Sequence, residues 1–459
     1  MTSTLLKPAS SRPLNSPTLH QLDNGLTIVA EQIPVDAVNL SLWLNAGSAN
    51  EPDAFNGMAH FLEHMVFKGT DRLQVGEFER LVEQRGAVAN AATSQDYTCY
   101  YITAAPKDFA ELAPLQLEVV FNAGIPDDAF EQERMVVLEE IRRSQDSPQR
   151  RTFRRSMELA FEQLPYRRPV LGPVSAVEQL TVQQMRDFHK SFYQPAAMTA
   201  VAVGNLPVDR LIQGVIDGLA GCERFPYGEA KPTHSIENPY SAWPDGQRSP
   251  SGLAWEQPAY EMEPAFETNV RREFVDPSLQ QARLVMLWRV PGLLDLQQTY
   301  ALDVIAAVLG YGRMGRLVRE LREERGLVAA VAVRNMIQRL QGTFYVSVQL
   351  PAENLAAVEA AVVHHIRRLQ SESVTGAEIE RIRTQVANRF IFGNESPRDR
   401  ASLYGYYHSL AGDLTPALTY SARLQSLNAE DLQVAVWKYL SPEAYGTVIL
   451  RPTTETVNG

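Results

Sequence analysis

The sequence predicts an α+β protein made of two homologous halves, each a mixed sheet with helices packed on it. Residues 180–203 and 427–450 share one pattern, a capped helix followed by an aromatic residue, a proline and an apolar strand. A second landmark repeats at nearly the same separation along the chain. It is a Ser-Pro step, which follows an acidic helix at residue 147 and occurs again at residue 396. Between the halves, Pro226 to Pro264 carries seven prolines, a composition typical of a linker.

These landmarks divide the chain into four segments. We predict a disordered N-terminal arm over 1–18, a first half over 19–225, the Pro-rich linker over 226–264, and a second half over 265–459. The arm contains no apolar core long enough for a secretory signal, and we expect a cytoplasmic protein.

The elements of the first half follow from turn signals and periodicity. Asn24-Gly25 between apolar runs predicts a hairpin, and alternation of apolar and polar residues predicts the later strands. Glycines and acidic first turns mark the helix ends. The predicted elements are a hairpin over 19–31, a strand over 38–46, helices over 56–69 and 75–85, a strand pair over 87–104, and helices over 107–123 and 127–145.

Composition excludes some classes of function. The net charge of −11 over 459 residues argues against a nucleic-acid or membrane-surface binder. No apolar run is long enough to span a membrane. The two cysteines, Cys99 and Cys222, cannot form a disulfide framework, and we expect both to be small buried hydrophobic residues.

One stretch carries a metal-binding pattern. The segment NGMAHFLEHMVFKG, residues 56–69, places His60, Glu63 and His64 in the order His-x-x-Glu-His. On a helix, residues four apart share a face, so His60 and His64 can bind one metal ion. Glu63 lies on the adjoining face, where it can reach a water at that metal. Two imidazoles and a carboxylate suit zinc, and this order is the inverzincin motif.

The acidic helix over 127–145 offers further carboxylates. Glu133 and Glu140 lie two turns apart on one face, whereas Glu139 lies on another face and can pair with Arg143. In the duplicated half, Arg389 stands where Glu140 stands in the first. We therefore predict that the second half has no matching metal ligand.

Four segments together resemble a known family: AHFLEHMVFKGT, GAVANAATSQDYTCYY, ERMVVLEEI and RLVRELREERGL. They resemble the pitrilysin-type zinc peptidases of the inverzincin class, on the branch with the mitochondrial processing peptidase and its bacterial relatives. The resemblance implies one zinc ion per chain, held by His60, His64 and Glu140, with Glu63 as general base. It also implies that Glu133 supports the site from outside the ligand shell.

The resemblance further implies how a substrate is bound. Asn90 and Ala91 would lie on an edge strand to which an extended peptide adds, whereas Thr93 is expected to be a packing residue, as is Tyr97. Arg322 matches a family arginine that binds the substrate backbone. The family's tyrosine, seven residues later, is replaced by Ala329.

The predicted function is therefore that of a zinc metalloendopeptidase acting on extended or unfolded peptides in an enclosed chamber. The missing tyrosine suggests the catalytic subunit of a heterodimer, whose homologous partner supplies the Arg/Tyr pair; a homodimer is the other possibility. The alternative function is a non-catalytic core subunit, or a peptide-recognition subunit, of a larger complex.

Overall fold

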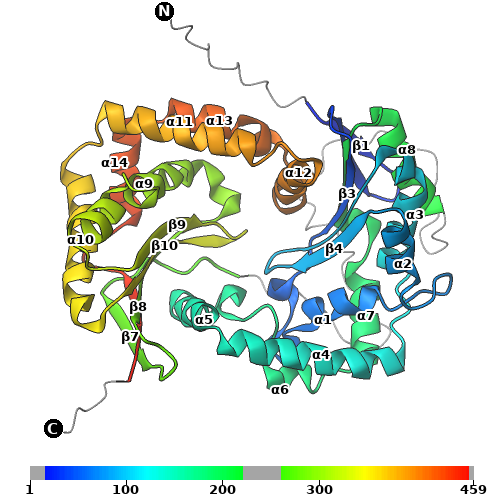
Figure 1. The fold of residues 1–459 in the computed structure, drawn as a ribbon, viewed down its shortest axis with the longest axis horizontal. Helices are drawn as coiled ribbons and strands as arrows, with labels where there is room; N and C mark the ends of the chain where they lie inside the picture. The colour runs from blue at the N-terminus through cyan, green and yellow to red at the C-terminus, as the bar shows by residue number, and fades with distance from the viewer. Residues whose placement is uncertain (1–15, 221–259, 454–459) are drawn as a thin grey trace, which may run out of the picture.

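The computed structural model describes residues 16–220 and 260–453, which form two sheets with helices around them (Figure 1). Most of the predicted arm over 1–18, most of the predicted linker over 226–264, and Cys222 lie outside the described residues. Within the part of the chain that is described, no helix is both long and apolar enough to cross a membrane.

The first sheet has six strands in the order β1-β2-β6-β3-β5-β4. The predicted hairpin is confirmed as the antiparallel pair β1 and β2, and the predicted strand pair as β5 and the edge strand β4. The strands are β1 Thr18–Gln21, β2 Thr27–Gln32, β3 Val38–Leu44, β4 Val88–Thr93, β5 Thr98–Ala104 and β6 Met198–Gly204.

The second sheet repeats the first. Its order is β7-β11-β8-β10-β9, and in each sheet one parallel pair, β2 with β6 or β7 with β11, is followed by antiparallel neighbours. Among the described strands only β1 has no counterpart, so the predicted duplication is confirmed. The strands are β7 Val270–Val275, β8 Ala282–Pro291, β9 Ala330–Met336, β10 Gln341–Leu350 and β11 Gly446–Arg451.

Helices cover both sheets, and they agree with the repeated sequence pattern. The predicted caps are present: Thr181 accepts from the Gln184 N–H before α7, and Asn428 accepts from the Glu430 and Asp431 N–H groups before α14. The helices of the first half are α1 Met58–Val66, α2 Glu77–Gln84, α3 Phe109–Phe121, α4 Asp127–Asp146, α5 Pro148–Ala160, α6 Val174–Val177, α7 Val182–Phe192 and α8 Val208–Ala220. Those of the second are α9 Tyr300–Gly310, α10 Leu355–Ser371, α11 Gly376–Phe392, α12 Pro397–Ala411, α13 Thr415–Ser426 and α14 Ala429–Tyr439.

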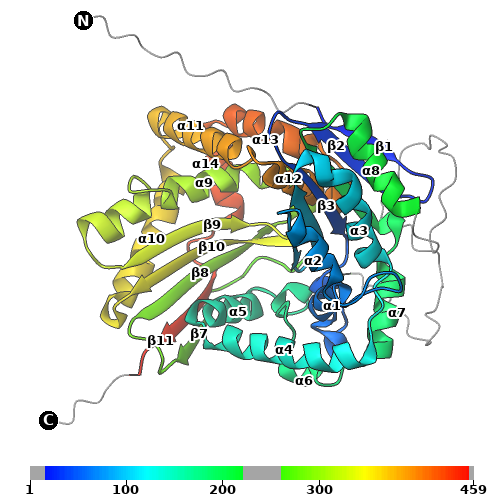
Figure 2. The same cartoon turned by 45° about the vertical axis from the view of Figure 1, so that its right-hand side comes forward.

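The two halves exchange helices. Helix α5 follows α4 in the first half but packs on β8 and β11 of the second sheet, whereas α12 of the second half packs on β3 and β6 of the first sheet. Figure 2 shows α12 beside β3 and α5 beside β8 and β7. The Ser-Pro steps begin these two helices, with Ser147 and Ser396 as their N-caps. Each sheet therefore has one apolar face on which a helix of the opposite half packs.

A glycine marks each of the two exchanged contacts. A Cβ at Gly405 of α12 would overlap the Trp43 indole on β3, and a Cβ at Gly446 of β11 would overlap Leu159 of α5. Helix and sheet approach so closely that neither position has room for a side chain.

A buried carboxylate begins the helix that carries the histidines. Glu51, which is 1% exposed, accepts hydrogen bonds from the Gly57 N–H at 2.8 Å, the Ala59 N–H at 2.6 Å and the Asn56 side chain at 2.9 Å. It thus occupies the positive end of the α1 dipole and satisfies donors that the helix leaves free. Burial raises the pKa of Glu51 to about 7, against these hydrogen bonds, which act to lower it.

The exchanged helix gives a stability prediction. Gly405→Ala should lower the free energy of unfolding by about 1–3 kcal/mol, because the new methyl group overpacks the contact with Trp43. Gly376→Ala in α11 is the matched control, since no heavy atom lies within 4 Å of its Cβ position, and it should leave stability nearly unchanged. Urea unfolding of both variants measures the difference. Equal stability of the two would contradict the close approach.

The Glu51 cap gives a pH prediction. A carboxyl whose folded-state pKa is raised contributes stability below about pH 4.5 that is lost as the pH rises through about 7. The stability of the wild type relative to Glu51→Gln should therefore fall over this range by about 3 kcal/mol, at 1.36 kcal/mol per pKa unit. Unfolding at a series of pH values measures this slope, with Glu83→Gln at an exposed carboxylate as control. A flat difference would contradict burial as the dominant effect.

Candidate metal centre

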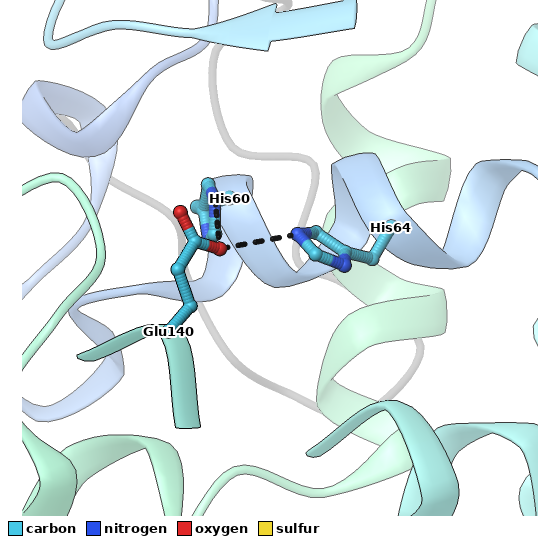
Figure 3. A group of neighbouring side chains, drawn as sticks. All are labelled: His60, His64 and Glu140. Carbon is cyan, nitrogen blue, oxygen red and sulfur yellow. Dashed lines mark ion pairs between the residues drawn. The ribbon is translucent and has the colours of Figure 1, made fainter. Parts of the chain in front are cut away.

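The predicted ligands converge from two helices. His60 and His64 lie one turn apart on α1, and Glu140 comes from α4, which packs against α1. Oε2 of Glu140 lies 3.5 Å from Nε2 of His60 and 3.7 Å from Nε2 of His64 (Figure 3). The three side chains thus point at one another, although 76 residues separate His64 from Glu140 along the chain.

This geometry fits zinc. Ligand atoms about 2.1 Å from a tetrahedral zinc ion lie about 3.4 Å apart, close to both measured distances. One ligand atom of each residue lies within 4.8 Å of the others, and no second cluster of three histidine, cysteine, aspartate or glutamate residues with such spacing occurs among residues 16–220 and 260–453. His60 Nδ1 is buried and has no hydrogen-bond partner among these residues. The donor set is two imidazoles and one carboxylate, which leaves a fourth position open.

Electrostatics shift the pKa values of the three candidate ligands in different directions. Burial, together with the nearby His64, lowers the pKa of His60 to about 4, so this imidazole is neutral. The hydrogen bond between Glu140 and His64 lowers the pKa of Glu140 despite burial. Burial also acts to lower the pKa of His64, but the hydrogen bonds to Glu140 and Glu133 outweigh it, so the pKa is raised. Metal binding at His64 therefore displaces a proton.

Glu133 lies where the resemblance implies a supporting carboxylate. Its Oε2 is 3.2 Å from Nδ1 of His64, and its Oε1 forms an ion pair with Lys68, two residues after the end of α1. A carboxylate on Nδ1 fixes the ring so that Nε2 points at Glu140. Lys68 was not foreseen from the sequence, where it follows the His-x-x-Glu-His motif without any distinctive spacing.

Glu63 does not point at the other carboxylates but at a strand. Its Oε2 accepts a hydrogen bond of 2.5 Å from the Thr93 hydroxyl at the end of β4. The prediction that Thr93 is only a packing residue is therefore wrong, because it orients the candidate base. Tyr97 does pack, with its ring 4.7 Å from that of Trp43. Burial raises the pKa of Glu63, and the hydrogen bond from Thr93 offsets part of this rise.

The site opens into a large cavity between the halves. The cavity has a volume of about 1420 Å³, and His60, Glu63 and Glu140 lie in its wall. The end of β4, from Ala92 to Gln95, forms a neighbouring part of the wall, and strands β8, β9 and β10 form the opposite part. The volume exceeds that of most small-molecule pockets, so the space can hold an extended chain.

The predicted substrate-binding residues lie farther out. Asn90 and Ala91 are on the edge strand β4, as expected, but neither is in the cavity wall, and the Asn90 side chain accepts the Ala91 N–H at 2.8 Å. Arg322 is in a π-helical segment, Val318–Glu324, where it is exposed and pairs with the adjacent Glu323 at 2.6 Å. The structure thus brings together the metal and base residues, but not Arg322.

The second half has other residues at the positions that correspond to the candidate ligands. Helix α9 packs on β9 as α1 packs on β4, and Asp303, Ala306 and Ala307 have the spacing of His60, Glu63 and His64. These three residues line a smaller cavity of about 770 Å³ together with Arg389, the residue predicted to replace Glu140. Burial raises the pKa of Asp303 to about 6, and Asn335 and Tyr420 donate hydrogen bonds to it.

Comparison with known proteins agrees with this division. Residues 27–174 match the family model described as insulinase, peptidase family M16, and residues 179–386 match the model described as the peptidase M16 inactive domain. A Helicobacter pylori protein named zinc protease PqqE is 26% identical over 439 residues, 94% of this chain and 92% of that protein. A Mycobacterium bovis protein named an uncharacterized zinc protease is 27% identical over 446 residues, 97% of this chain and 95% of that protein.

Solved structures share the fold. A protease from Helicobacter pylori superposes with a TM-score of 0.83 at 24% identity, covering 96% of this chain and 100% of that one. A Pseudomonas fluorescens chain described as a peptidase M16 inactive domain gives a TM-score of 0.80 at 19% identity, covering 96% and 99%. Since both halves match models of one family and relatives align over nearly their whole length, the chain belongs to the pitrilysin-type peptidases, peptidase family M16.

Proposed function

We propose that this protein is a zinc-dependent endopeptidase that hydrolyses extended or unfolded peptides, with one zinc ion per chain. The observation that carries the proposal is the convergence of His60, His64 and Glu140 beside the candidate base Glu63 in the wall of one cavity. Relatives named zinc proteases align over nearly the whole chain, which supports the same function.

The chain's own residues would perform the proton transfers. When bound, zinc supplies Lewis-acid chemistry that polarises the scissile carbonyl and makes a water molecule more acidic. Glu63 would take a proton from that water and later pass it to the leaving amine. Thr93 would hold the carboxylate in position throughout.

The edge strand β4 would position the substrate. β4 pairs with β5 on one side only among the described strands, so its other edge is available for an added strand. Its end, Ala92 to Gln95, lies in the cavity wall beside Glu63. A peptide added there would run past the metal site, and a folded protein would not enter. This geometry favours extended or unfolded substrates.

We further propose that the active form includes a homologous partner subunit. Ala329 stands where active relatives are expected to have a tyrosine, and Arg322, the other member of that pair, pairs with Glu323 outside the cavity wall. The chain therefore has no phenol at this position to bind the peptide and stabilise charge on its carbonyl oxygen. A partner that carries the Arg/Tyr pair would supply it.

The base and ligand roles give a paired prediction. Glu63→Gln should keep its zinc but hydrolyse peptides about 10²–10⁴-fold more slowly, because it removes only the proton acceptor. Glu140→Gln should lose zinc, whereas Glu139→Gln, at the exposed neighbour that pairs with Arg143, should not. Zinc content by atomic absorption and cleavage of an unstructured peptide separate these effects. Loss of zinc in Glu63→Gln would contradict its assignment as base.

The missing phenol gives another prediction. The purified chain should bind zinc but cleave peptides about 10²-fold more slowly than the chain mixed with its partner, the cost typical of one lost transition-state donor. Ala329→Tyr should raise the activity of the chain alone. Ala377→Tyr, at an exposed position of α11 outside the cavity wall, is the matched control. Full activity of the pure chain, unchanged by any partner, would contradict the proposal.

A further inference from the structure

Arginine side chains dominate the cavity wall opposite and beside the metal site. Seven arginines but only four glutamates line the cavity, and no lysine or aspartate does. The wall therefore carries an excess of positive charge, although the whole chain has a net charge of −11. The arginines are Arg150, Arg151, Arg154, Arg167, Arg168, Arg283 and Arg334.

From this wall we infer that the protein selects peptides with acidic side chains near the bond to be cleaved. The inference rests on the proposed function, because it assigns a substrate class to the same cavity. The selecting residues are Arg283 and Arg334 on the second sheet, with Arg150 on α5.

Most of the other arginines are already neutralised. Arg167 and Arg168 both pair with Asp53, at 2.7 and 2.8 Å, and Arg151 pairs with Asp276 at 2.7 Å. The Nε of Arg154 lies 3.4 Å from a carboxylate oxygen of Glu158. These side chains hold the fold around the cavity, so a substrate would gain little from them.

Arg150, Arg283 and Arg334 differ, because none of them has an ion-pair partner among the described residues. Arg334 is exposed, and Nε of Arg283 is buried without any hydrogen-bond partner there. All three side chains line the cavity, where a carboxylate can accept two parallel hydrogen bonds from one guanidinium group. These arginines without an ion pair point to a ligand that carries carboxylates.

The two sheet arginines lie around one tyrosine. Arg334 of β9 is directly opposite Tyr345 of β10, and Arg283 of β8 is opposite Gln349, four residues further along β10. Side chains at positions separated by an even number of residues share a face of a strand, so both arginines face the cavity with Tyr345. Burial raises the pKa of Tyr345, while both guanidinium groups act to lower it, which agrees with their closeness to its ring.

The glutamates of the wall do not balance these charges. Glu63 is the candidate base and Glu140 a candidate zinc ligand, so both would face the metal ion. Glu158 already pairs with Arg155 at 2.9 Å as well as with Arg154. That leaves Glu178, which is exposed and has no ion pair among the described residues. A peptide on the β4 edge therefore meets a positive wall on its far side, which attracts acidic side chains and repels basic ones.

Peptide binding without turnover tests the inference separately from the proposed function. Zinc-loaded Glu63→Gln is titrated with dye-labelled peptides of equal length, blocked at both ends, that differ only in central Glu, Gln or Lys residues. The Glu peptide should bind about tenfold more tightly than the Lys peptide at low salt, and about 0.5 M salt should remove most of this difference. Equal binding of all three peptides, or no binding, would overturn the inference.

Variants then locate the effect. In the same Glu63→Gln background, Arg334→Glu should lose the preference, and Arg283→Gln should reduce it at least threefold. Arg210→Glu, at an exposed arginine on α8 outside the cavity wall, should keep it. An acidic preference that survives Arg334→Glu together with Arg283→Gln would overturn the assignment.

Two further arms separate the remaining explanations. A peptide with central Gln and a free C-terminus tests whether the arginines bind a terminal carboxylate; tighter binding of this peptide than of the Glu peptide would overturn the assignment to side chains. Cleavage of the same Glu, Gln and Lys peptides, now with free ends, by the wild-type chain together with its partner tests the proposed function alone. Acidic preference in binding without any cleavage would support the inference and contradict the proposed function.

Discussion

Two helices that cross between the halves determine much of this structure. Each sheet buries one face against a helix that belongs to the other half of the chain. Helix α12 packs on the first sheet, and α5 packs on the second. Glycines at 405 and 446 leave room for the side chains of Trp43 and Leu159 to pack against the backbone. Burying an apolar sheet face is the dominant favourable contribution to folding, so neither sheet has its complete core without the other half. The two halves therefore form a single packed unit, and the cavity lies between them within that unit.

The exchange also couples the metal site to the opposite wall. Glu140 lies on α4, and after the Ser147 cap the chain continues directly into α5, which packs on the second sheet. Pro148, the first residue of α5, lies eight residues after Glu140, so the helix that carries a candidate zinc ligand is joined directly to the helix that packs on the second sheet.

The duplicated halves have diverged into different tasks on one scaffold. Strand order and direction are the same in both, yet the three ligand positions of α1 and α4 are matched by Asp303, Ala307 and Arg389. The second half instead contributes the unpaired arginines of β8 and β9 to the cavity. Acidic groups gather at the metal site, whereas basic groups gather on the facing wall of the cavity. The net charge of the whole chain does not reveal this separation.

Much of the fold could be predicted from the sequence because its signals are local or repeated. The α-helical period places His60 and His64 on one face whatever surrounds them, and duplication shows itself as a repeated pattern of caps, prolines and apolar runs. The pairing of Glu139 with Arg143 is equally local, and the structure contains it at 3.2 Å. Family resemblance added Glu140, which no spacing could have selected.

Tertiary structure alone decided the contacts between distant segments. The Glu51 cap, the Thr93 hydrogen bond to Glu63 and the Lys68 pair with Glu133 all depend on how elements pack, and each residue type is common on surfaces. Which arginines stay unpaired also depends on the position of every nearby carboxylate. The sequence by itself determined the two-half architecture and the residues able to bind zinc. Packing decided what orients those residues and what faces them, because side-chain partners far apart in the chain are chosen by the folded geometry.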